Sequence, residues 1–379
     1  MIQDVLLSLS ILLFLTKIFG EISERIGLSS ITGEVLVGIL LGPSVLNIVA
    51  PNEFIEIIAM LGVLSLLFLA GLSTAFDSLN DIYKATIIAL FSGILSLVLT
   101  FSISRLFGLD TISSIVVGVA LISTSISVSI RTLTDIGEIY SKSVKTMVSA
   151  SVGDDILAIL ALSLLMGYVN VKTITGFNLL KMFLIVIGFY VIVLNLGSLI
   201  SRKMTNFFAS MKDEQGLISM ALVTMLFISI IADKLNITIL TGAFLAGMML
   251  AKSEYSQSII PKLKVIGHGF LIPIFFAYVG INVNINAISS GFYLLIAIFL
   301  AEAIAKFLGG YYGSKFAGME SSEAIKIGAG LIPMGEYTLI TAFIALTMNV
   351  IEVKIYSILI CIVFLTNIIT PRVLRFAYS

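Results

Sequence analysis

A series of long apolar segments, separated by short stretches rich in charged, proline, asparagine and glycine residues, limits what this 379-residue chain can fold into. A helix needs about 20 apolar residues to cross a bilayer, with a range of about 17–25. Breaks at the polar stretches leave thirteen such segments: 4–20, 31–49, 54–75, 84–107, 111–133, 144–168, 177–201, 215–233, 237–252, 265–281, 288–314, 322–347 and 352–376. The sequence therefore predicts an all-α polytopic membrane protein with 13 transmembrane helices in a single unit, 1–379.

The composition indicates that lipid is the main surrounding of the chain. Hydrophobic residues make up 59% of it and charged residues 12%, whereas soluble domains carry about 25% charged residues. The 22 basic and 22 acidic residues balance, so no nucleic acid partner is expected. The single cysteine excludes a disulfide framework and a zinc cluster. No phosphate-binding motif, metal-ligand set or Ser–His arrangement appears at membrane depth, so we expect neither an enzyme nor a cofactor.

The basic residues of the loops predict the orientation in the cytoplasmic membrane. Fifteen lie on the side that follows the first span: Arg25, Lys84, Arg131, Lys142, Lys145, Arg202, Lys203, Lys212, Lys252, Lys262, Lys264, Lys315, Lys326, Arg372 and Arg375. Five lie on the other side: Arg105, Lys172, Lys181, Lys234 and Lys354. Basic loops stay in the cytoplasm. Because thirteen spans place the termini on opposite sides, the N-terminus is predicted outside and the C-terminus in the cytoplasm.

Two similar stretches indicate an internal repeat. Residues 32–41 and 241–250 share Thr, Gly, Leu, Gly and Leu at an offset of 209, and the same offset relates Gly71 to Gly280. A chance match among apolar helices, which share a small alphabet, is the alternative. The stretches open the second and ninth spans, which are seven spans apart. Because seven is odd, the chain enters these two spans from opposite sides of the membrane. The copies, about 31–201 and 237–376, would therefore face opposite ways, as in the inverted-topology repeats of secondary transporters.

Matching positions in the two copies predict broken helices. Pro333 and Gly335 lie in the middle of the twelfth span, and proline removes a backbone donor. The corresponding stretch of the fifth span, 123–127, is rich in hydroxyl groups. Unwound backbone at this depth is tolerated only where it is buried or lines a cavity, and half-helix ends there offer carbonyl groups to a cation. Two crossing broken helices therefore predict an ion site at the membrane midplane.

Several charged residues fall inside the predicted spans, where charges are costly and functional by default. Asp154 and Asp155 lie about eleven residues into the sixth span, roughly 16 Å deep. Lys306 lies in the eleventh span, with Glu302 one turn before it. Ion pairing that only stabilises helix packing is the alternative role for Lys306 and Glu302. It does not suit two adjacent buried acids, which cannot both stay charged without a cation or a proton.

Taken together, these residues resemble the monovalent cation:proton antiporters, in the double-aspartate branch that includes electrogenic bacterial sodium/proton antiporters. The resemblance covers nearly the whole chain and is carried by Gly153-Asp154-Asp155, Lys306, the run 32–43 and Pro333-Met334-Gly335-Glu336. It implies the sodium/proton antiporter fold and an elevator-type homodimer. A core domain, 84–168 and 288–376, would hold the ion, and a panel domain, 1–75 and 215–281, would form the dimer.

The resemblance also implies the roles of individual side chains. The transported Na⁺ would bind at Asp155 and Asp154, and Asp155 would also carry protons. Asp154 would pair with Lys306, whereas Thr124 and Ser125 would add ligands at the break. The implied function is secondary active exchange of Na⁺, or of Li⁺ or K⁺, for H⁺ by alternating access, which serves pH homeostasis.

The sequence departs from the family pattern in two places. Met334 stands where the family often has Arg, so Glu336, which would lie close to the site, lacks that partner. Glu302 is an unexpected acid one turn from Lys306 and could compete with Asp154 for it. No nucleotide-binding domain is expected after the last span, which argues against a nucleotide-gated potassium-efflux system.

Two other kinds of transporter remain as alternatives. A K⁺/H⁺ antiporter would use the same carboxylates. A Na⁺-coupled organic-solute symporter can share the architecture, but it would need a wider cavity with a polar or aromatic lining. A channel would need a continuous polar pore, and no repeated selectivity ring appears.

The residues suggest how exchange would be coupled. Burial disfavours the charged form of an acid, and a nearby cation favours it. Lys306 would hold Asp154 ionised while Asp155 carries a proton. Na⁺ would displace that proton and weaken the Asp154–Lys306 pair, after which Lys306 would give up its own proton. Two protons would then leave for each Na⁺, so the exchange is expected to be electrogenic.

Overall fold

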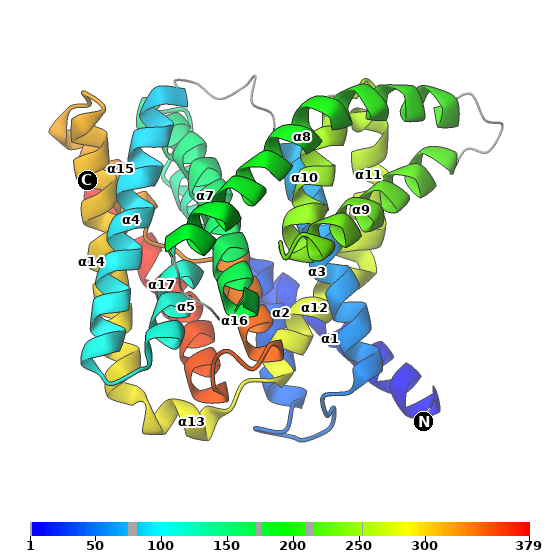
Figure 1. Ribbon diagram of the computed structural model, residues 1–379. Coiled ribbons are helices and arrows are strands. Elements are labelled where there is room, and N and C mark those ends of the chain that lie inside the picture. The colour runs from blue at the N-terminus through cyan, green and yellow to red at the C-terminus, as the bar shows by residue number, and fades with distance from the viewer. Residues whose placement is uncertain (1, 75–81, 172–175, 210–214, 252) are drawn as a thin grey trace. The chain divides into compact units, whose positions relative to one another are not determined.

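The computed structural model describes residues 2–74, 82–171, 176–209, 215–251 and 253–379. All regular structure in this part of the chain is helical (Figure 1), which confirms the all-α class. The helices are α1 (Ile2–Arg25), α2 (Ser30–Leu41), α3 (Glu53–Ser73), α4 (Ile82–Leu106), α5 (Thr111–Ala120), α6 (Ile126–Asp135), α7 (Lys142–Val171), α8 (Gly176–Ala209), α9 (Gly216–Lys234), α10 (Ile239–Ala251), α11 (Ser256–Ile266), the π-helical η2 (Gly267–Leu271), α12 (Ile272–Ile281), α13 (Ile285–Ser290), α14 (Phe292–Phe316), α15 (Ser321–Gly330), α16 (Glu336–Thr347) and α17 (Val353–Tyr378).

Each of the thirteen predicted spans corresponds to one helix or to consecutive helices. The fifth and twelfth spans are broken as expected, into α5 and α6 and into α15 and α16. Within the described ranges, eight helices are long and apolar enough to cross a membrane, and the other apolar helices are shorter. Lys172, Lys212 and Lys252, which contributed to the predicted orientation, lie outside the described residues. The orientation stays a prediction.

Local chemistry decides where several helices begin and stop. Asn52 caps α3 and Asp110 caps α5, each accepting a hydrogen bond from the backbone N–H three residues on, at 3.0 and 2.8 Å. Such caps satisfy donors that the first turn leaves open. Non-helical backbone over 121–125 separates α5 from α6, and over 331–335 it separates α15 from α16. The second gap contains Pro333, which has no N–H to continue a helix.

The helices pack into two compact units. One consists of 1–9, 52–78 and 160–275, and the other consists of 10–51, 79–159 and 276–379. Residues 10–51, predicted to belong to the panel domain, pack in the second unit with most of the predicted core. The units describe packing, and the division into core and panel domains stays a prediction.

Each unit contains a close backbone contact between two glycines. In the second unit Gly38 of α2 meets Gly280 of α12, where a Cβ on Gly38 would lie 1.9 Å from a carbonyl oxygen of α12. In the first unit Gly247 of α10 meets Gly71 of α3, where a Cβ on Gly247 would lie 2.2 Å from a carbonyl oxygen of α3. The offset of 209 that relates Gly38 to Gly247 also relates Gly71 to Gly280. The two contacts are therefore equivalents, as an internal repeat requires.

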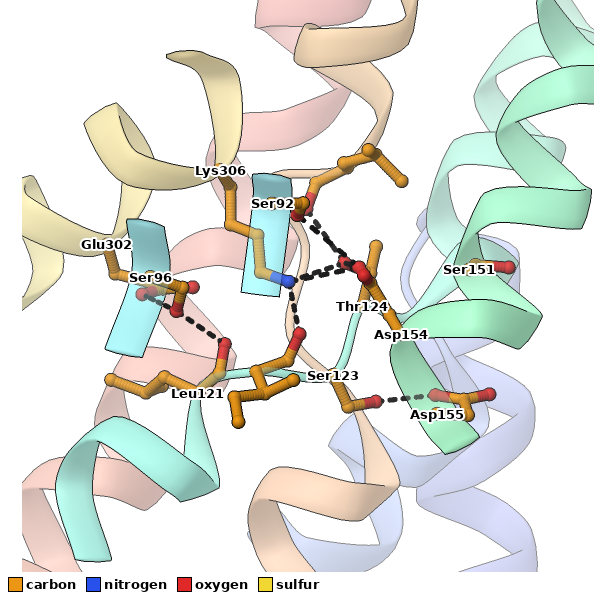
Figure 2. Close-up of polar contacts among 12 residues, drawn as sticks. Ser92, Ser96, Leu121, Ser123, Thr124, Ser151, Asp154, Asp155, Glu302 and Lys306 are labelled. Carbon is orange, nitrogen blue, oxygen red and sulfur yellow. Dashed lines mark hydrogen bonds and ion pairs between the residues drawn. The ribbon is translucent and has the colours of Figure 1, made fainter. Parts of the chain in front are cut away.

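Small residues also bring α4 and α14 together in the second unit, where the two helices lie side by side (Figure 1). A Cβ on Gly309 would lie 2.6 Å from the Cα of Ser92, so only glycine allows this approach. Two turns before Gly309, Glu302 of α14 contacts the Ser96 hydroxyl of α4 (Figure 2). Lys306, on the same helix, is buried beside the broken helices.

Candidate functional site

The two breaks cross each other in the second unit, as predicted. The Ser125 N–H donates to the carbonyl oxygen of Pro333 at 2.7 Å, so the non-helical segments are joined through their main chains. Next to it, the Thr124 hydroxyl lies 3.2 Å from the carbonyl oxygen of Leu331, and the Ser129 hydroxyl donates to that of Gly330 at 2.8 Å. Backbone groups freed by the breaks are thus partly satisfied by the other break, which keeps them at this depth.

Lys306 lies beside this crossing, paired with Asp154 of α7 (Figure 2). Its Nζ is 3.1 Å from Asp154 Oδ2 and 3.0 Å from the Thr124 hydroxyl, and it also donates to the carbonyl oxygen of Ile122. Both charged side chains are 0% exposed. The three acceptors match the three protons of an ammonium group. The carboxylate partner of Lys306 is therefore Asp154.

Asp155 has different surroundings from Asp154. Its Oδ1 accepts a hydrogen bond of 2.6 Å from the Ser123 hydroxyl at the first break, as Figure 2 shows, and its side chain is partly exposed. Glu336, also partly exposed, interacts electrostatically with Asp155. Glu336 is the first residue of α16, and the positive end of a helix dipole stabilises a carboxylate there. The accessible acids of the site are thus Asp155 and Glu336.

Ser125 and Thr124 lie at the centre of the crossing. The Thr124 hydroxyl is 2.7 Å from Asp154 Oδ2 and is already occupied by the pair. Ser125 directly precedes α6 but makes no capping hydrogen bond with its side chain, and a Cβ added to Gly335 would lie 2.6 Å from the Ser125 Cβ. The Ser125 hydroxyl is therefore the less committed of the two oxygen ligands predicted at the break.

Glu302 does not pair with Lys306 in this structure. Its Oε2 lies 2.6 Å from the Ser96 hydroxyl of α4, and its Oε1 is buried with no hydrogen-bond partner among the described residues. The side chain is 0% exposed. Of the two acids predicted to compete for the lysine, Asp154 holds it, and Glu302 interacts with it only through space.

Three hydroxyl groups of the site were not predicted: Ser92 and Ser96 of α4, and Ser123. Ser92 donates to Asp154 Oδ2 at 3.4 Å. The sequence does contain a signal for Ser92 and Ser96. Hydroxyl residues recur every four positions at Ser92, Ser96, Thr100 and Ser104, which places them on one face of α4, and all four are buried. Ser123 stands in the predicted break, where nothing in the sequence distinguishes its hydroxyl from those of its neighbours.

The charges at the crossing do not balance. Asp154, Asp155 and Glu302 each interact with one lysine, Lys306, and Glu336 interacts with Asp155. Buried charges that lack partners are expensive. The excess negative charge must be met by protons or by a cation, and oxygen ligands suit a small hard cation. A site of this kind can exchange the two.

Known proteins are similar to this chain in sequence and in fold. The Na⁺/H⁺ antiporter of Enterococcus hirae is 30% identical over 369 residues, which cover 97% of this chain and 96% of that protein. The Na⁺/H⁺–K⁺ antiporter GerN of Bacillus cereus is 26% identical and covers 98% and 95%. The solved structure of the sodium proton antiporter MjNhaP1 from Methanocaldococcus jannaschii aligns with a TM-score of 0.77 over 99% of both chains at 14% identity, which shows the fold.

These relatives are transporters rather than enzymes. The model of the transmembrane sodium/hydrogen exchanger family matches residues 10–378. The chain thus belongs to the sodium/hydrogen exchanger family.

Proposed function

We propose that this protein is a secondary active antiporter that exchanges Na⁺ for H⁺ across the cytoplasmic membrane. The observation that carries the proposal is the excess of carboxyl groups over lysine at the crossing of two broken helices. Such a group of acids needs either protons or a cation to be neutral. The Enterococcus and Bacillus relatives, both named as antiporters of Na⁺ and H⁺, support it.

Competition at Asp155 couples the two ions in this proposal. Asp155 is partly exposed, so water, protons and cations can reach it, whereas Asp154 is held by Lys306. Na⁺ arriving at Asp155 displaces its proton and takes further oxygen ligands from Asp154, Thr124 and Ser125. The proton returns when the site opens to the other side. Because one carboxylate cannot hold both ions, Na⁺ and H⁺ cross on alternate half-cycles and in opposite directions.

The movement that exposes the site in turn is proposed to be of the elevator type, in a homodimer. The resemblance to the family supports this part of the proposal. An outward N-terminus and a cytoplasmic C-terminus follow from the loop charges. Electrogenic exchange of two protons for each Na⁺ requires a second proton-binding group besides Asp155.

The cation is tested directly, because the same oxygen ligands accept Na⁺, Li⁺ and K⁺. Purified protein in proteoliposomes, with a pH dye inside and the membrane potential clamped by an ionophore, is challenged with each cation in turn. We expect Na⁺ to drive proton movement that protein-free vesicles do not show. The name of the Bacillus relative makes K⁺ the second candidate. Absence of proton movement with Na⁺ would overturn the proposal, and movement with K⁺ alone would make the protein a K⁺/H⁺ antiporter instead.

A further inference from the structure

Glu302 is a buried acid for which the exchange at Asp155 has no use. It lies on α14 one turn before Lys306, 0% exposed, and contacts α4 rather than the lysine. The charged groups that act on it through space are Lys306 of its own helix and Asp154 of α7. Glu302 does not serve as the ion-pair partner of Lys306, because the ammonium group already has three other acceptors.

The hydrogen bonds of Ser96 indicate which form Glu302 adopts. The Ser96 Oγ lies 2.8 Å from the carbonyl oxygen of Leu121 and 2.6 Å from Glu302 Oε2. A serine hydroxyl has one proton and can donate to one of these two oxygens. If Glu302 carries a proton, it donates to Ser96, and Ser96 donates to Leu121, so both contacts are hydrogen bonds. If Glu302 is ionised, one of the two contacts has no proton.

The other oxygen of Glu302 agrees with the neutral form. Oε1 is buried without a hydrogen-bond partner among the described residues. An ionised carboxylate with one oxygen in apolar surroundings is far more costly than a neutral acid with an unbonded carbonyl. With Lys306 matched by Asp154, a proton on Glu302 also keeps the buried cluster of Asp154, Glu302 and Lys306 neutral.

We propose, resting on the antiport function above, that Glu302 carries the second proton of the exchange cycle and that Lys306 keeps its own proton throughout. When Na⁺ draws Asp154 toward itself, the ammonium of Lys306 loses its counter-ion. Glu302, one turn away, replaces it: its proton leaves Oε2 for the water on the side from which Na⁺ entered, and its carboxylate then faces the lysine. Asp155 loses one proton and Glu302 loses another, while one Na⁺ is gained. The loaded site is one unit more negative than the proton-bound site.

The test compares the voltage dependence of wild-type exchange with that of Glu302→Gln. Glutamine has the shape of the neutral acid, and its amide can donate to Ser96, so the packing is preserved. Wild-type protein in clamped proteoliposomes should exchange two protons for each Na⁺, with a flux that reverses with voltage. Glu302→Gln should exchange one proton for each Na⁺ without dependence on voltage, and Glu302→Asp should restore the dependence in part. Glu320→Gln, at an exposed position beside α15, is the matched control.

The outcomes separate this inference from the proposed function. No Na⁺-driven proton movement in the wild type would remove the function itself. Wild-type stoichiometry in Glu302→Gln would overturn the role of Glu302 and leave antiport intact. If Glu302→Gln does not fold, infrared difference spectra of wild-type protein give the answer. Na⁺ should remove the carbonyl bands of two protonated carboxyl groups, and loss of one would contradict the inference.

Discussion

Asp154 and Asp155 are neighbours in the chain with different surroundings, because successive residues of a helix point about 100° apart. Asp154 turns into the contact between α4 and α14, where it is 0% exposed and is bonded to Lys306, Thr124 and Ser92. Asp155 turns toward the first break and is partly exposed. In this structure one acid is therefore paired with Lys306, and the other is partly exposed.

The first prediction at this scale concerns Asp155→Asn. An amide cannot bind or release a proton at neutral pH, so Na⁺-driven proton movement in proteoliposomes should fall to the level of empty vesicles. The fold should survive, because the amide can still accept a hydrogen bond from Ser123. Size-exclusion profiles and thermal unfolding check this, with Asp135→Asn, at an exposed position on α6, as the control. Transport retained in Asp155→Asn would refute the assignment of the site.

Removal of the buried lysine gives a second prediction. Lys306→Ala leaves Asp154 as a buried carboxylate without its cation, a loss that typically costs about 3–5 kcal/mol. The unfolding midpoint should drop markedly. The double variant with Asp154→Asn should regain much of it, because the unpaired charge is gone. Equal midpoints for Lys306→Ala and the double variant would show that the ion pair does not stabilise the protein.

At the scale of the element, glycine contacts and interrupted helices shape the structure. Gly38 and Gly247 occupy equivalent positions where two backbones touch. A methyl group at either position has to displace main-chain atoms, which cannot change rotamer to avoid it. The positions are therefore fixed by packing and not by helix propensity.

The corresponding prediction compares alanine at three glycines. Gly38→Ala and Gly247→Ala should each destabilise the protein by about 1–3 kcal/mol or more, as overpacking does. Gly188→Ala in α8, where no neighbouring atom lies within 4 Å of the place that a Cβ would take, should be neutral or stabilising by up to about 1 kcal/mol. Thermal unfolding of the three variants gives the comparison. A Gly38→Ala protein as stable as Gly188→Ala would contradict the close contact.

The helices of this protein could be predicted from sequence because a bilayer allows few kinds of structure to cross it. Thirteen apolar segments and two breaks follow from length and from residues such as Pro333, and the structure agrees. The partners of buried side chains could not be predicted in the same way. Whether Lys306 bonds to Asp154 or to Glu302 depends on where α4, α7 and α14 meet in space. That meeting depends on close contacts such as the one between Gly309 of α14 and Ser92 of α4, which lie far apart in the sequence.

At the scale of the whole molecule, the proposed function depends on protons and cations sharing one partly exposed acid, Asp155. The sequence indicates a transporter of this class through its family resemblance, and the match of the family over residues 10–378 confirms the family. Flux measurements across the membrane give the number of protons exchanged for each Na⁺.

Shared use of Asp155 leads to a prediction for the intact transporter. Protons compete with Na⁺ for the same carboxylate, so lowering the pH on the side of Na⁺ entry should raise the apparent KM for Na⁺. The maximal rate should stay nearly constant, because saturating Na⁺ displaces the proton. Initial rates of Na⁺ uptake at several pH values and Na⁺ concentrations distinguish the possibilities. A falling maximal rate with unchanged KM would place the proton at a separate site.

The centre of the crossing is tied by main-chain atoms, from the N–H of Ser125 to the carbonyl oxygen of Pro333. Nearly every amino acid presents these same atoms, so this joint tolerates sequence drift. That tolerance suits a fold that persists between this chain and MjNhaP1 at 14% identity. Evolution can therefore alter the hydroxyl and carboxyl groups around the ion, and with them the choice of cation, while the scaffold that presents them stays unchanged.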